Sequence, residues 1–185
     1  MLILASSSPR RAELLRAAGI PFQVYPVNVD ESALKLEPPG EHVRRLAKQK
    51  ADAAFATNAD AVVLGADTIV LISGELLGKP RDIRHAVRML RLLSGREHEV
   101  LTGIAIVSKR GTAVEVARTR VWVTPLSDAE IDEYVATGEP MDKAGAYGIQ
   151  GLGSKFIDRI QGSYSNVVGL PVSLVYRLLK GYPER

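Results

Sequence analysis

Short apolar runs, or apolar residues that alternate with polar ones as at 22–27, predict β-strands at several places along the chain. They cover residues 2–5, 22–27, 61–65, 68–72, 100–107 and 114–123. The segment Lys109–Thr112 joins the last two runs, is polar and contains a glycine. We therefore expect a hairpin there.

Apolar residues spaced three or four apart predict five helices between and after these strands. The helices are expected to begin after Ser8, near Glu41, after Asp82, after Ser127 and at Pro171. Pro9 suits a first helical position, and Ser127 with Glu130 forms an S-x-x-E capping box. The glycine-rich stretch 142–169 shows neither the apolar pattern of a strand nor that of a helix. The mixture predicts an α/β fold with a partly antiparallel sheet, in one domain spanning residues 1–185.

Composition limits the chemistry that the chain can perform. Its 185 residues include no cysteine, which excludes disulfides, thiolate metal ligands and a cysteine nucleophile. No run approaches the length of a membrane span, and the apolar start is too short for a signal peptide. We therefore expect a cytoplasmic protein that does not bind a membrane. The formal net charge of +3 suits a small anionic ligand better than a nucleic acid.

The run Ser6–Arg11 is the first candidate for chemistry. A strand that leads into a helix N-terminus presents backbone N–H groups and a partial positive charge, which together attract an anion. Arg10 and Arg11 lie in the first helical turn, where a cation is disfavoured unless an anion accompanies it. This pattern favours a phosphate ligand. The alternative is a solvated pair of arginines balanced by Glu13.

Charged residues at two further places could serve the same ligand. Lys50 falls on the apolar stripe of its helix and should point inward, although its amine could also reach water along the surface. Asp67 ends an apolar strand, where it could hold a metal or activate water, or simply cap a turn. Lys79 lies in a Gly-Lys-Pro loop and could reach a phosphate, or remain an exposed lysine.

The glycine-rich stretch carries the remaining polar candidates. Asp142 and Lys143 add charge there, and the amide of Gln150 can both donate to and accept from a base edge. The histidines have no metal-ligand spacing, and His42 and His85 are expected at the surface. Trp122, on the predicted hairpin, is expected to pack rather than to stack on a base.

Taken in order, these motifs resemble the Maf family from Leu2 to about Leu179. The resemblance is carried by Ser6-x-Ser8-Pro9-Arg10-Arg11, Lys50, Gly65-Ala66-Asp67-Thr68, Gly78-Lys79-Pro80, Asp142 to Tyr147, Gly162-Ser163-Tyr164 and Gly169-Leu170-Pro171. It implies a two-lobed α/β fold with an elongated mixed sheet and a central cleft, similar to the inosine triphosphate pyrophosphatases. It also implies a nucleoside triphosphate pyrophosphatase that needs Mg²⁺ or Mn²⁺, acts in nucleotide house-cleaning and could form a homodimer.

The resemblance also assigns roles to individual residues. Arg10, Thr68 and Gln150 match the positions associated with dTTP and UTP, and the wider substrate set comprises Ser6, Ser8, Arg11, Asp142 and Lys143. Asp67, Lys50, Lys79 and Glu31 are the catalytic candidates, with Glu31 and Asp67 as metal ligands. Modified pyrimidine nucleotides are further candidate substrates. The alternatives are a 7-methyl-GTP pyrophosphatase and a nucleotide-binding regulator of septum formation without catalysis.

Overall fold

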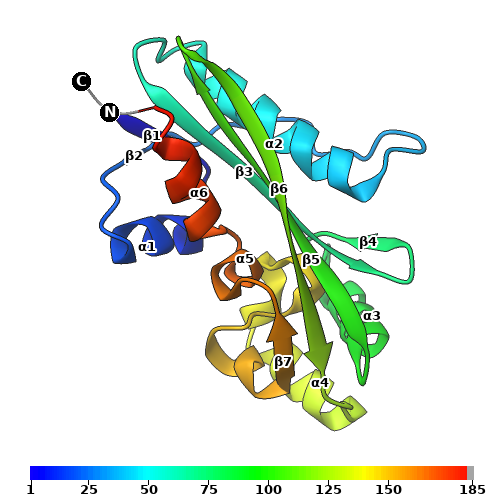
Figure 1. Ribbon diagram of the computed structural model, residues 1–185. Coiled ribbons are helices and arrows are strands. Elements are labelled where there is room, and N and C mark those ends of the chain that lie inside the picture. The colour runs from blue at the N-terminus through cyan, green and yellow to red at the C-terminus, as the bar shows by residue number, and fades with distance from the viewer. Residues whose placement is uncertain (183–185) are drawn as a thin grey trace. The chain divides into compact units, whose positions relative to one another are not determined.

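The protein is described here by a computed structural model in which residues 1–182 are defined (Figure 1). Its seven strands form one mixed sheet with the order β2-β1-β3-β5-β6-β7, and β4 pairs with β3. The strands are β1 (Leu2–Ala5), β2 (Gln23–Val24), β3 (Val62–Ile72), β4 (Glu75–Leu77), β5 (Glu97–Ser108), β6 (Gly111–Val123) and β7 (Ile157–Gln161). Strand β1 pairs in parallel with β2 and β3, whereas the β3–β4 and β6–β7 pairs are antiparallel.

Helices connect these strands. The α-helices are α1 (Pro9–Ala17), α2 (Pro39–Phe55), α3 (Ile83–Leu93), α4 (Asp128–Ala136), α5 (Tyr164–Val168) and α6 (Val172–Leu179). The 3₁₀-helices are η1 (Glu139–Asp142), η2 (Ala144–Ala146) and η3 (Gly151–Phe156). The prediction of an α/β fold with a partly antiparallel sheet is confirmed. No helix within residues 1–182 is long and apolar enough to cross a membrane.

Two compact units divide the chain, and each is assembled from separate segments. Unit 1 comprises residues 1–67, 102–117 and 169–185, and unit 2 comprises residues 68–101 and 118–168. Because β3, β5 and β6 each contribute residues to both units, neither unit corresponds to one uninterrupted stretch of sequence.

Unit 1 buries apolar side chains on both faces of its strands. Alternate residues of β1, such as Leu4 and Ile3, point to opposite faces, as the two-residue period of a strand requires. One face packs on α1 and α6, through residues such as Leu15 and Val175. The other face packs on the alanines of α2. Burial on both faces explains why these strands are continuous apolar runs.

Unit 2 has a single core. It gathers apolar residues from α3, α4, β5 and β6, and α3 packs on α4 and η2. Asp82 caps α3 by accepting a hydrogen bond from the backbone N–H of His85 at 2.7 Å. The predicted capping box of Ser127 and Glu130 is present at the start of α4.

Some predictions about the elements were wrong. The predicted strand 22–27 shrinks to the two residues of β2, and the short β4 was not predicted. Ile83, the first residue of α3, is 63% exposed although it is apolar, because no helical turn precedes it to cover its side chain.

Candidate active site

The N-terminal run folds as a strand that leads directly into a helix. Strand β1 ends at Ala5, and α1 begins at Pro9 with Ser8 in the N-cap position. The Ser8 hydroxyl does not cap the helix; instead the Ser8 backbone N–H donates to Oγ of the buried Ser6 at 3.2 Å. The predicted placement of this run at a helix N-terminus is confirmed.

Arg11 is a buried arginine that binds main-chain groups from distant parts of unit 1. Its Nε donates to the carbonyl of Gly169 at 2.8 Å, and its Nη1 donates to Oγ of Ser6 at 3.0 Å and to the carbonyl of Ala66 at 2.9 Å. Burial lowers the pKa of Arg11, while the negative charge of Asp67 acts in the opposite direction. The guanidinium therefore ties together β1, β3 and the chain before α6, whereas its contact with substrate stays a prediction.

Lys50 lies on the buried side of α2 and contacts two carboxylates. Its Nζ is 2.7 Å from Oδ1 of Asp67 and 2.6 Å from Oε1 of Glu31. The side chains of Lys50 and Asp67 are 11% and 10% exposed, whereas that of Glu31 is 61% exposed. The ammonium offsets the repulsion that two neighbouring carboxylates would otherwise feel. The inward direction of Lys50 is confirmed, and unit 1 brings together three of the four predicted catalytic residues.

A close approach of helix to strand makes this contact possible. A Cβ atom placed on Gly65 would lie 2.1 Å from the carbonyl oxygen of Ala47 and 2.9 Å from Cβ of Ala51. Only glycine allows backbone to come so near. Since Gly65 precedes Asp67 by two residues in β3 and Lys50 lies beside Ala51 in α2, this packing sets the distance between the two charges.

The loop before α2, which carries Glu31, is held by a network that the sequence did not indicate. Arg45 donates to the carbonyl of Ser32 at 3.0 Å and to Oε1 of Glu37 at 2.6 Å. Hydrogen bonds, chiefly from Arg45, lower the pKa of Glu37 to about 2. His42 also contacts Glu37 and is buried, so its expected place at the surface was wrong. No spacing rule connects residues 32, 37, 42 and 45, because a loop brings them together.

Unit 2 holds the remaining predicted residues. Lys143 Nζ donates to Oδ1 of Asp142 at 2.8 Å and to the main-chain carbonyl of Glu139 at 2.5 Å. Gln150 is exposed just before η3, and Lys79 is exposed between β4 and α3. Thr68 is partly exposed and follows Asp67 directly in β3.

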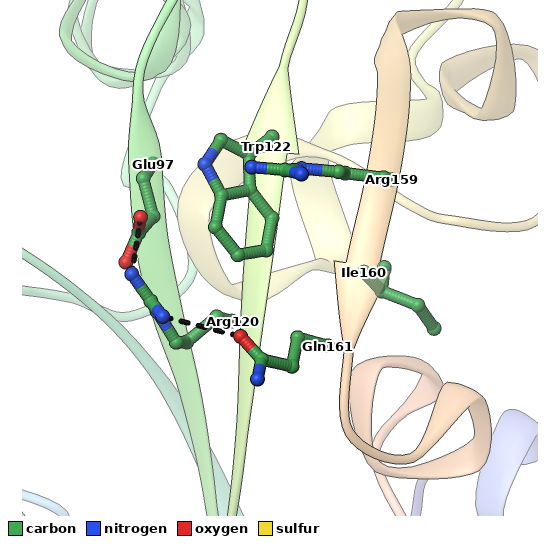
Figure 2. A pocket seen from close by; sticks show the side chains of 6 residues that line it. All are labelled: Glu97, Arg120, Trp122, Arg159, Ile160 and Gln161. Carbon is green, nitrogen blue, oxygen red and sulfur yellow. Dashed lines mark hydrogen bonds and ion pairs between the residues drawn. The ribbon is translucent and has the colours of Figure 1, made fainter.

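A separate pocket in unit 2 contains none of the predicted site residues. It measures about 450 Å³ and is lined by Glu97, Arg120, Trp122, Arg159, Ile160 and Gln161 (Figure 2). The indole of Trp122 lies between two guanidinium groups, whose Cζ atoms are 4.1 Å (Arg159) and 4.9 Å (Arg120) from its ring centre. Arg120 also binds Glu97 and Gln161. Trp122 is partly exposed and contacts both arginines by cation–π interaction, and its expected role in packing rather than base stacking stays a prediction.

Comparison with protein families identifies the chain. The family model described as Maf-like protein matches residues 1–182. The chain belongs to the Maf family. A Bacillus cereus (strain AH820) relative named dTTP/UTP pyrophosphatase is 51% identical over 181 residues, which cover 98% of this chain and 95% of the relative. A relative of the same name from Geobacter sp. (strain M21) is 52% identical over 181 residues, covering 97% and 94%.

A solved structure supports the fold of this Maf-like chain. The Ham1 protein of Staphylococcus aureus superposes with a TM-score of 0.60, covering 98% of this chain and 99% of its own. Its sequence identity is 14%, so the likeness concerns architecture alone. The resemblance to the Maf family is therefore confirmed by sequence, and the expected α/β fold with a mixed sheet is confirmed by structure.

The carboxylates of unit 1 suit a hard divalent cation. Glu31 and Asp67 both approach the same positive group, which shows that their oxygens can converge on one cation. Residues 1–182 contain no group of three or more His, Cys, Asp or Glu side chains that could hold a metal ion. Mg²⁺ is commonly bound by one or two carboxylates together with substrate phosphates and water, so a site with two carboxylates fits it.

Proposed function

We propose that this Maf-family protein hydrolyses dTTP and UTP to the nucleoside monophosphate and pyrophosphate. The observation that carries the proposal is the cluster of Lys50, Asp67 and Glu31 in unit 1, in which a buried ammonium joins two carboxylates whose charges also act on Arg11 in the first turn of α1. The names of relatives about half identical to the chain over nearly its full length support the substrate.

In this proposal unit 1 performs the chemistry. Asp67 accepts a proton from the attacking water as the water oxygen bonds to the α-phosphorus. The bond from that phosphorus to the oxygen bridging to the β-phosphate breaks, and pyrophosphate departs with the electron pair of that bond. Glu31 and Asp67 would hold Mg²⁺ or Mn²⁺, which supplies positive charge against the triphosphate. Lys50 keeps the two carboxylates together before substrate binds and then opposes phosphate charge.

Further residues are proposed to bind the substrate. Ser6, Ser8 and the backbone at the start of α1 face the phosphates, together with the side chains of Arg10 and Arg11. In unit 2, Lys79 and Lys143 supply positive charge, and Asp142 orients Lys143 through the ion pair at 2.8 Å. Thr68 and Gln150 contact the pyrimidine base, which would also admit modified pyrimidines.

The proposal predicts a clear result from a panel of nucleoside triphosphates with Mg²⁺. Monophosphate and pyrophosphate should appear in equal amounts, with dTTP and UTP turned over faster than dCTP, CTP, ATP, GTP and 7-methyl-GTP. Release of orthophosphate instead would contradict the assigned bond. A preference for 7-methyl-GTP would instead support the alternative function, a 7-methyl-GTP pyrophosphatase. Tight binding without turnover, with Mg²⁺ and with Mn²⁺, would favour the non-catalytic regulator.

Two further expectations belong to the same proposal. The activity needs only nucleotide and metal, so we infer a cytoplasmic protein that requires neither nucleic acid nor membrane. We also infer a homodimer, as in the sequence-based expectation. Sedimentation velocity of the purified chain at micromolar concentration tests the dimer, and a single monomeric species would contradict it.

A further inference from the structure

A carboxylate in unit 2 lies directly beneath the loop that carries Gln150. Oε2 of Glu139 accepts a hydrogen bond from the backbone N–H of Leu152 at 2.9 Å, and Oε1 accepts one from that of Gly153 at 3.0 Å. Oε1 also accepts the hydroxyl of Tyr134 at 2.9 Å. A carboxylate accepts backbone N–H bonds that are stronger than bonds between neutral groups. One side chain therefore fixes the path of the chain just after Gln150.

The same network reaches the other side of Gln150. The Tyr134 hydroxyl accepts a hydrogen bond from the backbone N–H of Gly148 at 3.3 Å. Tyr134 itself is buried and meets Phe156 edge to face, with ring centres 5.2 Å apart. The loop is thus attached before Gln150 to the buried Tyr134 and after Gln150 to Glu139, which Tyr134 in turn binds.

Two glycines show how closely the loop follows this support. A Cβ atom on Gly151 would lie 2.7 Å from Oε2 of Glu139, and Gly151 has a φ of +68°. A Cβ atom on Gly153 would lie 2.6 Å from the Tyr134 hydroxyl. A side chain at either place would collide with the support, so the glycines and Glu139 form one fitted arrangement.

The Glu139 carboxylate is charged under ordinary conditions. Partial burial would by itself raise the pKa of Glu139, but the hydrogen bonds from Leu152, Gly153 and Tyr134 outweigh burial and lower it. The charged form accepts hydrogen bonds at both oxygens without donating one. It therefore suits all three donors at once.

Discrimination between pyrimidines requires such a support. Thymine and uracil offer a donor at N3 and an acceptor at O4, whereas cytosine offers an acceptor at N3 and a donor at N4. A glutamine amide carries one acceptor and one donor group, so it pairs with either pattern when it turns over by half a rotation. Its choice depends on approaching the base from one fixed direction.

We propose that Glu139 is a positioning residue that sets base selectivity by fixing the Gly148–Gly153 loop and thereby the approach of Gln150. Glu139 itself contacts main chain and Tyr134 rather than substrate. This proposal rests on the proposed function, because it needs Gln150 to contact the base. It separates selectivity from hydrolysis: a loosened loop weakens the preference for thymine over cytosine more than it slows the chemical step.

The test compares kcat and KM for dTTP and dCTP in Glu139→Gln, Tyr134→Phe and a matched control. In Glu139→Gln the ratio of kcat/KM for dTTP to that for dCTP should fall at least tenfold, mainly through a higher KM for dTTP. Tyr134→Phe keeps the packed ring but loses both hydroxyl bonds, and should shift the ratio in the same direction by a smaller factor. The matched control is Glu133→Gln, at an exposed position of α4, the helix that carries Tyr134. It should leave the ratio unchanged.

A double-mutant comparison distinguishes positioning from a general loss of structure. In a Gln150→Ala background, Glu139→Gln should change the ratio no further, since it acts through a side chain that is already gone. An additional change of similar size there, or an unchanged ratio in both single variants, would overturn the proposal. If Glu139→Gln fails to fold, the same comparison is made with Tyr134→Phe, in the unaltered protein and in Gln150→Ala, and its result decides whether the proposal stands. Failure of the proposed function is seen separately, as absence of pyrophosphate release from dTTP by the unaltered protein.

Discussion

The two units hold their candidate residues in different ways. In unit 1 the ammonium of Lys50 binds the carboxylates of both Asp67 and Glu31, so the candidate side chains hold one another in place. In unit 2 the carboxylate of Glu139 binds backbone N–H groups and leaves Gln150 exposed. Substitutions in unit 1 should therefore alter the rate for every substrate, and substitutions in unit 2 should alter the choice among substrates.

Replacing Asp67 by Asn should give the largest effect. Loss of a general base typically lowers turnover by about 10²–10⁴-fold, and the loss should be equal for dTTP and UTP because the proposed role of Asp67 is in the chemical step and not in base binding. Pyrophosphate release at saturating substrate measures it. Asp52→Asn, which alters an exposed pair with Lys48 on the same helix as Lys50, is the control. Turnover near that of the unaltered protein would remove Asp67 from the role of base.

Gly65→Ala tests whether packing in unit 1 sets the charge cluster. The new Cβ atom would lie 2.1 Å from the carbonyl oxygen of Ala47, so α2 must shift. We expect unfolding in urea to show a loss of about 3 kcal/mol, together with slower turnover of all substrates. Gly78→Ala meets no atom within 4 Å and should be nearly neutral in stability. A stable Gly65→Ala protein with full activity would mean that the cluster tolerates movement of the helix.

As the pH is lowered, protonation linked to His98 in unit 2 should reduce folding stability at a higher pH than protonation of Glu37 in unit 1. Burial lowers the pKa of His98, beside Tyr147, to about 4 from 6.5. Below pH 6.5 the unfolded chain takes up a proton that the folded chain refuses, so stability falls as pH drops from 6.5 towards 4, by about 3 kcal/mol in total. The stability contributed by Glu37 in unit 1 is lost only at lower pH, between about 4.5 and 2. The reason is that the pKa of Glu37 is about 2 in the folded protein and 4.5 ordinarily.

Urea unfolding as a function of pH measures this difference. His98→Gln can still bond the Tyr147 hydroxyl but cannot take up a proton, so the fall in stability between pH 6.5 and 4 should largely disappear. The same substitution at the partly exposed His85 should leave the slope in place. An unchanged slope in His98→Gln would assign the acid sensitivity to other groups.

Gln150→Ala should give the smallest change, confined to the choice of substrate. Loss of one neutral hydrogen-bonding amide at an exposed position should lower the dTTP-to-GTP selectivity by about tenfold, equivalent to about 1.4 kcal/mol, with little change in kcat. Steady-state kinetics on both nucleotides measures it. An unchanged ratio would contradict base contact by Gln150, and an equal loss of kcat on both substrates would place it with the chemistry of unit 1.

Sequence patterns predicted the strands and helices that are determined by residues close together in the chain. The strands around Leu4, Leu64 and Ile104 follow from buried apolar runs, and α3 and α4 follow from their caps. Lys50 was placed correctly because helical spacing puts it on the buried stripe. In contrast, residues 142–169 form short elements that depend on contacts such as those of Glu139, and no sequence period marks them.

The sequence did not distinguish the environments of neighbouring residues of the same type. Arg10 and Arg11 occupy the same helical turn, and only the structure shows that Arg11 is buried on three main-chain and hydroxyl acceptors. The acceptors come from segments far apart in the chain, so their convergence depends on the tertiary fold. His42 was misplaced for the same reason, since its partner Glu37 lies in a loop.

The bonds of Arg11 also bear on how the chain is completed during synthesis on the ribosome. Unit 2 has all of its residues once Val168 has emerged, but unit 1 still waits for Gly169, the acceptor for Nε of Arg11. Until then the guanidinium lacks one of its buried partners, and burying it is costly. Unit 1, although its first segment is made before any of unit 2, should therefore reach its final form last, after Gly169 and α6 have been made.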